Sequence, residues 1–257
     1  MKTRIAVIGG TGLEDSFIEG EKTRVGTPFG PSPTLTVASV GSKDIVFLPR
    51  HGERHILPPH KINYRANIWA LHSMGVERIL ATNAVGAINP GMMPDDLVVP
   101  SDFVDFTRRP ATFYDEPPVT HIDVTSIYCP ELRRILAKTA LQEGAKIHDE
   151  GVYLCTEGPR YESPAEIRIF RDWGCDVVGM TGIPEAILAH ELGMCYASLC
   201  YVTNMAAATG THIAAEDISS RGKKITETLQ RIITRTAEAT PRRRSCTCSE
   251  SLEGARV

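Results

Sequence analysis

The chain has 257 residues, of which 42% are hydrophobic and 23% charged, with a formal net charge of −3. These values are typical of one globular domain whose core needs no disulfide or metal, and they offer no general attraction for nucleic acid or acidic membranes. No apolar run approaches the roughly 18 residues that a membrane-spanning helix needs. A strand at 4–8 with no signal peptide ahead of it, and seven mostly isolated cysteines, predict a cytoplasmic protein with reduced thiols.

Apolar runs and helical patterns alternate along the chain. Strands are expected where β-branched and apolar residues cluster, at 5–8, 45–48, 79–82, 97–99, 177–178 and 195–202. Helices are expected where apolar residues recur with helical spacing, at 63–74, 132–143, 164–173, 184–192 and 218–238. This alternation predicts an α/β domain over residues 1–240, with a mostly parallel sheet flanked by helices and a C-terminal tail at 241–257.

Three loops that follow predicted strands carry groups suited to an anion. Gly9-Gly10-Thr11-Gly12 lets backbone N–H groups and a hydroxyl approach a phosphate. The third glycine of a dinucleotide-binding loop would fall at Asp15, which disfavours a Rossmann cofactor site. Arg50 presents a fork that suits phosphate oxygens, although a lone arginine more often forms a structural ion pair. With the polar run 82–86, these loops predict a phosphate site at the carboxyl ends of the strands.

Two further loops supply the groups that a planar ligand needs. Thr156 to Glu162 and Gly179 to Glu185 place an aromatic ring, a carboxylate, a thioether and a hydroxyl between apolar strands. A π-face with a few polar atoms is typical of a site that binds an aromatic base. Ordinary turns rich in glycine and proline are the alternative interpretation.

On these motifs the chain resembles the trimeric purine nucleoside phosphorylases, and in particular their methylthioadenosine phosphorylase branch. The resemblance runs from Ile5 to about Leu229 and includes the segments Ile8–Gly12, Ala66–Leu71, Glu157–Arg160, Met180-Thr181 and Pro184-Glu185. It implies a twisted mixed β-sheet that is partly closed into a barrel and flanked by helices. It also implies a homo-oligomer, either a trimer or a dimer of trimers, and a reaction that uses inorganic phosphate as co-substrate with no metal, nicotinamide or other cofactor.

The resemblance also implies a set of site residues. For phosphate binding these are Thr11, Arg50, His51, Asn83, Ala84 and Thr181, with Asn83 at a position where the family often has threonine. For substrate binding they are Tyr161, Glu162, Met180, Asn204, Met205 and Ala206. Met180 is expected to pack under the ribose, with a plain core methionine as the alternative. Asn204 is the expected catalytic residue, because its amide can steady the purine as negative charge develops on it.

The base specificity follows from two departures within this family. Adenine-specific members carry Asp-x-Asp after the Thr203 position and a serine at the Glu162 position, whereas this chain has Asn204-Met205-Ala206 and a carboxylate. A carboxylate accepts a hydrogen bond from the N1–H of a 6-oxopurine but opposes the N1 lone pair of adenine. The sequence therefore predicts preference for hypoxanthine nucleosides, unless Glu162 points into solvent or caps the following helix.

The 5′ end of the sugar is expected to meet a small apolar wall. Ala215 stands where ordinary members of this class have a histidine for the 5′-hydroxyl, and Ile218 follows one turn later. Such a wall favours a methylthio group, although His212 could replace the missing histidine. His121 lies in a segment that in the family reaches a neighbouring subunit's site, and a plain surface or interface histidine is the alternative.

The expected activity is therefore phosphorolysis of S-methyl-5′-thioinosine. The alternatives are an S-methyl-5′-thioadenosine phosphorylase and a general 6-oxopurine nucleoside phosphorylase. A non-catalytic nucleoside-binding protein is an alternative of another class, and the presence of all the phosphate-contact residue types disfavours it.

The tail beyond Pro241 has lost its hydrophobic periodicity. Its arginines 242–244 are typical of a solvated run. The Cys-x-Cys spacing of Cys246 and Cys248 resembles the tails of some archaeal relatives that form a disulfide, and two free thiols are the alternative in a reducing compartment. A zinc site needs more ligands than these two.

Overall fold

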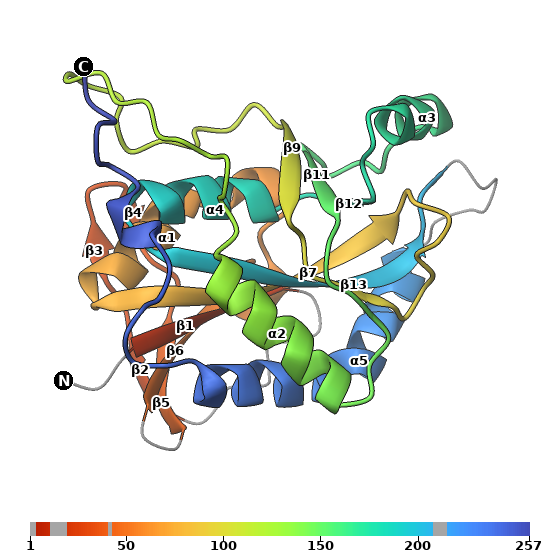
Figure 1. The fold of residues 1–257 in the computed structure, drawn as a ribbon, viewed down its shortest axis with the longest axis horizontal. Coiled ribbons are helices and arrows are strands. Elements are labelled where there is room, and N and C mark those ends of the chain that lie inside the picture. The colour runs from red at the N-terminus through yellow and green to blue at the C-terminus, as the bar shows by residue number, and fades with distance from the viewer. Residues whose placement is uncertain (1–3, 11–19, 41–42, 208–214) are drawn as a thin grey trace.

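The computed structural model describes residues 4–10, 20–40, 43–207 and 215–257 (Figure 1). Within these ranges one mixed sheet contains eleven strands: β1 (Arg4–Gly9), β2 (Glu21–Thr23), β5 (Leu35–Val40), β6 (Lys43–Pro49), β7 (Val76–Ala87), β8 (Leu97–Val98), β9 (Asp102–Phe106), β10 (Ile147–His148), β11 (Val152–Thr156), β12 (Val177–Gly179) and β13 (Cys195–Met205). A separate hairpin consists of β3 (Gly26–Thr27) and β4 (Gly30–Pro31). The α-helices are α1 (Tyr64–Ser73), α2 (Pro130–Gln142), α3 (Pro164–Asp172), α4 (Gly182–Glu191) and α5 (Ala215–Ala239), and short 3-10 turns are η1 (Glu53–His55), η2 (Pro59–Lys61) and η4 (Cys248–Glu250).

The sheet branches at its longest strand, β7. The main path runs β10-β8-β13-β7-β1-β6-β5-β2, with β1 and β13 both parallel to β7. At its far end β7 pairs antiparallel with β12, through Gly86 and Ala87, and β12 leads on to β11 and β9. One strand therefore serves two branches, and the described strands do not close into a continuous barrel. The expected mixed α/β fold is confirmed.

Helices cover both faces of the sheet (Figure 1). On one face α1 and α4 pack through residues such as Ile68 and Leu188. On the other face α2 and α5 pack through residues such as Leu136 and Ile232. Both faces of the central strands are buried, so these strands contain continuous apolar runs, and such runs were recognisable in the sequence.

The helix ends follow from ordinary capping chemistry. The Asn63 side chain accepts from the backbone of Ala66 at the start of α1, and Gly75 follows the helix with φ +75. Ser163 and Glu166 form a reciprocal capping box at the start of α3. These contacts confirm the predicted starts of both helices. The strands β2, β5, β9, β10 and β11 were not predicted. No residue of β2, β9 or β10 is fully buried, so these strands lack an apolar run, whereas β11 is mostly buried and was missed.

The C-terminal tail 241–257 folds back onto the domain. Arg244 donates to the carbonyl of Gly193, and a bridge joins Thr120 to Arg256. Cys248 is buried, in the same apolar cluster as α2 and α5. The tail contains no α-helix or named strand, which agrees with its lack of periodicity, but Arg244, Cys246 and Cys248 are half-buried or buried against the domain.

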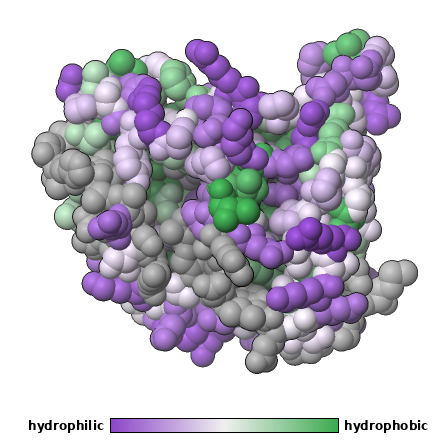
Figure 2. All heavy atoms as spheres, turned by 180° about the vertical axis from the view of Figure 1, so that it is seen from behind, coloured by the Kyte–Doolittle hydropathy of each residue, from purple (hydrophilic) through white to green (hydrophobic). Residues whose placement is uncertain are grey.

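The surface is rich in polar residues, as the charged content of 23% suggests. On the face seen from behind, most of the coloured residues are hydrophilic, and the hydrophobic ones gather in small groups (Figure 2). Among the described helices, none combines the length and apolar character needed to cross a membrane.

Candidate active site

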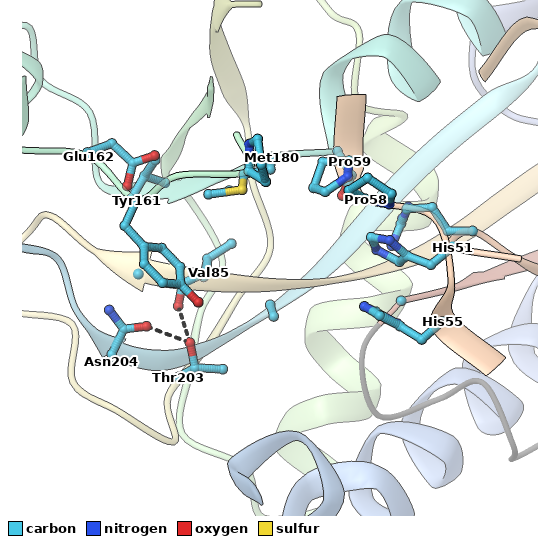
Figure 3. Close-up of a pocket in the computed structure, with 18 of the residues that line it drawn as sticks. His51, His55, Pro58, Pro59, Val85, Tyr161, Glu162, Met180, Thr203 and Asn204 are labelled. Carbon is cyan, nitrogen blue, oxygen red and sulfur yellow. Dashed lines mark hydrogen bonds between the residues drawn. The ribbon is translucent and has the colours of Figure 1, made fainter. Parts of the chain in front are cut away.

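A cavity of about 440 Å³ opens where several strands of the sheet end (Figure 3). Its volume lies within the range of small-ligand sites, roughly 300–1,000 Å³. The loops after β1, β6, β11 and β12 meet here together with the C-terminal ends of β7 and β13. Of the residues predicted from the sequence, the lining contains Arg50, His51, Ala84, Tyr161, Glu162, Met180, Thr181, Asn204 and Ala206.

Arg50 is the most tightly held residue of the lining. Its Nε and Nη2 donate to the two oxygens of Glu185 at 2.6 and 2.8 Å, and Nη1 donates to the carbonyl of Thr82 at 2.7 Å. Both side chains of the ion pair are almost fully buried. Burial alone would lower the pKa of Arg50, but the Glu185 carboxylate raises it above its ordinary value, so the guanidinium stays charged. The ion-pair interpretation is correct, and Arg50 nevertheless lines the cavity.

The side of this ion pair that faces the protein is tightly packed. Glu185 lies on α4 and also accepts from the Tyr196 hydroxyl at 2.9 Å. A Cβ added at Gly10 would lie 2.5 Å from Nη1 of Arg50, so a glycine is required where the β1 loop crosses the guanidinium. The backbone N–H of Gly10 donates to the Thr82 hydroxyl at 3.3 Å. Three segments far apart in sequence therefore fix one buried cation at the cavity wall.

His51 is held as a neutral imidazole. Its Nδ1 lies 2.8 Å from the carbonyl of Leu57, and its ring stacks on His55 at 4.1 Å. Burial, with the charge of Arg50 and the neighbouring His55, lowers the pKa of His51 to about 3. A carbonyl only accepts, so Nδ1 carries the proton, and Nε2 remains an acceptor. Such an imidazole can accept from a P–OH group but cannot add a positive charge.

Thr181 lies at the N-terminus of α4, where backbone N–H groups and the helix dipole favour an anion. Its hydroxyl donates to Oδ1 of Asn83 at 2.9 Å, and the Asn83 amide donates to Ser198 at 2.6 Å. Asn83 is buried and is not part of the cavity lining. It orients Thr181 from behind, while its neighbour Ala84 lines the cavity.

The other end of the cavity holds a carboxylate. Glu162 lines the cavity and accepts from the Thr156 hydroxyl at 2.6 Å. Burial raises the pKa of Glu162, and the hydrogen bond from Thr156 offsets part of the rise. The following helix is capped by Ser163 and Glu166, so Glu162 is not its cap. The neighbouring Tyr161 adds an aromatic ring to the lining (Figure 3).

A β-bulge places the third polar group. The register between β13 and β7 shifts between Val202 and Asn204, and the extra residue is Thr203. Bulges next to sites redirect side chains, and here both Thr203 and Asn204 line the cavity. The Asn204 side chain accepts from Thr203 at 2.7 Å and donates to the Met205 carbonyl at 2.9 Å. The bulge thus turns an amide from a continuous buried strand into the cavity that Glu162 also lines.

Residues 4–238 match the family described as the phosphorylase superfamily. That match covers most of the chain. The chain belongs to the phosphorylase superfamily. It is 48% identical to the 6-oxopurine nucleoside phosphorylase of Pyrococcus furiosus, with 98% of each chain covered. It is also 49% identical to a probable S-methyl-5′-thioinosine phosphorylase of Methanopyrus kandleri. That alignment covers 99% of this chain and 100% of the Methanopyrus protein.

Solved structures agree with this membership of the phosphorylase superfamily. The methylthioadenosine phosphorylase of Schistosoma mansoni, in complex with adenine, superposes with a TM-score of 0.89. The two chains are 31% identical, and 99% of each is covered. Sequence and structure thus identify the same family.

Two parts of this site were not predicted by the sequence analysis. The first part is Arg109, whose side chain is buried and links several loops. Its Nη1 donates to the Met180 carbonyl at 2.7 Å and to the Tyr64 hydroxyl at 2.8 Å. Its Nη2 donates to the carbonyls of Thr156 and Glu157. It ties the ends of β11 and β12 together beside the cavity. The second part is the wall formed after β6 by residues 55–59. No local pattern marks either, because both depend on contacts between distant segments.

Gly158 explains one element of the family motif. Its φ is +62, and an added Cβ would lie 2.6 Å from Sδ of Met180. A glycine is therefore needed for the turn and for the position of the thioether, which lines the cavity. Met180 packs as a wall residue rather than as part of the core.

The remaining predicted residues lie elsewhere or outside the described residues. Met205 does not line the cavity and packs against the apolar core. His121 lines a separate cavity beside the C-terminal tail and is not in this one. Thr11 and the side chains of Ala215 and Ile218 lie outside the described residues, as does His212. The expectations for those positions stay predictions.

Proposed function

We propose that this chain cleaves purine nucleosides with inorganic phosphate, releasing the free purine and a pentose 1-phosphate. The observation that carries the proposal is the arrangement of one cavity. A buried, permanently charged Arg50 and the N-terminus of α4 lie at one end, and a half-buried carboxylate with an amide lies at the other. The names of the relatives support the same reaction class.

The proposed mechanism follows from this separation. Phosphate lies against Arg50, Thr181 and the backbone N–H groups near Gly10 and Ala84, and attacks C1′ of the sugar. The C–N bond to the purine breaks as the C1′–O bond forms, so the electron pair leaves with the base. The phosphate anion stabilises the positive charge on the sugar, and the Asn204 amide donates to the purine as negative charge develops on it. The residues named provide binding, orientation and charge stabilisation, with no covalent intermediate.

We infer that the base is a 6-oxopurine. The Glu162 carboxylate accepts from N1–H of such a base, and the Asn204 amide donates to O6 or N7. With adenine, the carboxylate would face the N1 lone pair, at a cost of about 1–3 kcal/mol for an unpaired buried group. Glu162 already accepts one hydrogen bond from Thr156, which holds the carboxylate in the lining and leaves further lone pairs for a ligand. Tyr161 is the proposed aromatic neighbour of the base.

For the sugar we propose a 5′-methylthio group, with S-methyl-5′-thioinosine preferred to inosine. The support is the residue type at Ala215 and Ile218, which would form an apolar wall without a partner for a hydroxyl. The working form is proposed to be a homo-oligomer, a trimer or a dimer of trimers. In such an assembly His121, which lies away from this chain's own cavity, would be available to a neighbouring subunit.

The test is a substrate panel run with and without inorganic phosphate. The substrates are S-methyl-5′-thioinosine, inosine, guanosine, S-methyl-5′-thioadenosine and adenosine. Base release should require phosphate and yield the pentose 1-phosphate, with hypoxanthine nucleosides ahead of adenine nucleosides. Equal base release without phosphate would indicate a hydrolase. Tight nucleoside binding without any phosphorolysis would favour a non-catalytic binding protein.

The two finer assignments separate in the same panel. Equal kcat/KM for S-methyl-5′-thioinosine and S-methyl-5′-thioadenosine would reject the base assignment but leave phosphorolysis intact. A higher kcat/KM for inosine than for S-methyl-5′-thioinosine would reject only the 5′ assignment.

A further inference from the structure

Four cysteines from three separate elements meet in one cluster. Cys129 precedes α2 as its N-cap residue, Cys195 begins β13, and Cys246 and Cys248 come from the tail. Their four sulfur atoms all lie within 4.8 Å of one another. Three of the residues are buried and the fourth is half-buried. The tail sequence offered two ligands, and the fold supplies the other two.

The limit on the mutual distances fits a four-ligand site. Tetrahedral zinc with Zn–S bonds of about 2.3 Å places its four sulfurs about 3.8 Å from one another. Sγ of Cys195 lies 3.4 Å from Sγ of Cys246, and every other pair lies within the same 4.8 Å limit. In two disulfides each sulfur would instead be bonded to one partner at about 2.0 Å. The four cysteines are free, and their spacing has room for one ion between four thiolates.

A buried cation beside the cluster is the second observation. Arg78 lies in register with Cys195 on the neighbouring strand β7 and is fully buried. Its Nη1 donates to Glu131 at 2.7 Å, but Nε and Nη2 have no hydrogen-bond partner among the described residues. Glu131 in turn accepts from the Ser245 hydroxyl at 2.9 Å, next to the first tail cysteine. Unpaired buried N–H groups are costly, and an adjacent anion would compensate them.

We propose that Cys129, Cys195, Cys246 and Cys248 bind one structural zinc ion as thiolates. Binding releases the four thiol protons and involves no oxidant or reductant. The zinc–thiolate centre carries a net negative charge, which the guanidinium of Arg78 and the N-terminus of α2 stabilise. The ion would fasten the C-terminal tail to the start of β13, whose far end carries Asn204 into the active site. The role is structural, and the zinc takes no part in the reaction.

The test is the zinc content of the full-length protein purified without chelators. Elemental analysis should give about one zinc per chain after dialysis. In the double variant Cys246→Ser/Cys248→Ser the zinc content should fall about tenfold or more. Cys175→Ser, which alters a buried cysteine outside the cluster, should keep its zinc. Both variants leave the lining of the active-site cavity unchanged.

A second measurement covers the case in which the double variant does not fold. Wild-type protein produced with Co²⁺ in place of Zn²⁺ should show thiolate-to-cobalt charge transfer and the d–d bands of a tetrahedral sulfur site. Wild-type protein that contains no zinc would overturn the proposal. Alkylation under denaturing, non-reducing conditions would then distinguish two states of the cluster. Free thiols would all be alkylated, whereas two disulfides would be protected and would lower the mass by four hydrogens. Zinc retained by a folded double variant would also overturn the proposal.

Discussion

The two ends of the active-site cavity are built differently. At the phosphate end, Arg50 spends three of its N–H groups on Glu185 and Thr82, and both members of the ion pair are almost completely buried. At the base end, Glu162 has one hydrogen bond to a neighbouring side chain, and the adjacent Tyr161 is 38% exposed. The side chain at the phosphate end is therefore fixed by several hydrogen bonds, whereas the side chain at the base end is fixed by one.

This difference separates the proposed reaction from its specificity. A buried ion pair that loses one partner leaves an uncompensated charge, so the phosphate end tolerates little change. A half-buried carboxylate can be exchanged without disturbing the core.

The largest effect is expected at the phosphate end. Arg50→Lys keeps the positive charge but cannot pair with both oxygens of Glu185 and with Thr82 at once. We expect kcat/KM to fall by about 10²- to 10³-fold for every substrate, as when one preorganised donor is lost. The control is Arg65→Lys, which alters a half-buried arginine that is paired with Asp115 outside the cavity lining and should change the rate less than twofold. An Arg50→Lys rate close to that of the wild type would contradict the proposed contact.

The next effect concerns the choice of base. Glu162→Gln replaces an acceptor by an amide that can also donate to adenine N1. The ratio of kcat/KM for inosine to that for adenosine should fall by about 10- to 100-fold, equivalent to roughly 1–3 kcal/mol. Glu166→Gln removes the same charge from the adjacent helix start, outside the cavity lining, and should leave the ratio unchanged. An unchanged ratio in Glu162→Gln would rule out the contact with the base.

Variants of Arg109 test whether the residues at the base end depend on hydrogen bonds from a side chain outside the cavity lining. Arg109→Met removes the donors that hold the carbonyls of Met180 and Glu157. Because this residue does not line the cavity, the expected change is mainly a rise in KM of about tenfold, with a smaller loss in kcat. Arg108→Met, at an exposed neighbouring position, is the control. Partial recovery in Arg109→Lys would identify positioning, whereas a loss in kcat alone would contradict it.

The smallest expected effect is a dependence of base preference on pH. The pKa of Glu162 is raised by burial, so the carboxylate takes up a proton at a higher pH than an ordinary glutamate. Below that pKa the neutral acid can donate to adenine N1, and its remaining carbonyl oxygen accepts from the N1–H of a 6-oxopurine more weakly than the carboxylate does. The kcat/KM ratio of inosine to adenosine should therefore fall several-fold as the pH drops through this range. In Glu162→Gln the ratio should be independent of pH, and a wild-type ratio that is flat would argue against a titrating carboxylate at the base.

Much of this structure could be predicted from local patterns. Buried strands such as β1 and β13 contain continuous apolar runs, and Asn63 and Ser163 mark helix starts. The candidate site residues could be grouped because the loops that carry them follow strands, whose ends meet at one edge of the sheet. These features depend on sequence neighbours, so the sequence contains them directly.

The remaining features depend on long-range register. The bulge at Thr203 exists only in the pairing of β13 with β7, and the Arg109 clamp joins loops about fifty and seventy positions further along. Asn83 was expected to touch phosphate, but its amide is used by Ser198 and Thr181. The cysteine cluster likewise needs β13 and the tail to meet. No periodicity or motif encodes such meetings.

The most direct test of the account measures two variants on two substrates. Phosphate-dependent kcat/KM is determined for S-methyl-5′-thioinosine and S-methyl-5′-thioadenosine with wild type, Arg50→Lys and Glu162→Gln. We predict that Arg50→Lys lowers both values by the same factor and keeps their ratio, whereas Glu162→Gln changes the ratio. A changed ratio in Arg50→Lys, or an equal loss on both substrates in Glu162→Gln, would contradict the separation of a phosphate end from a base end.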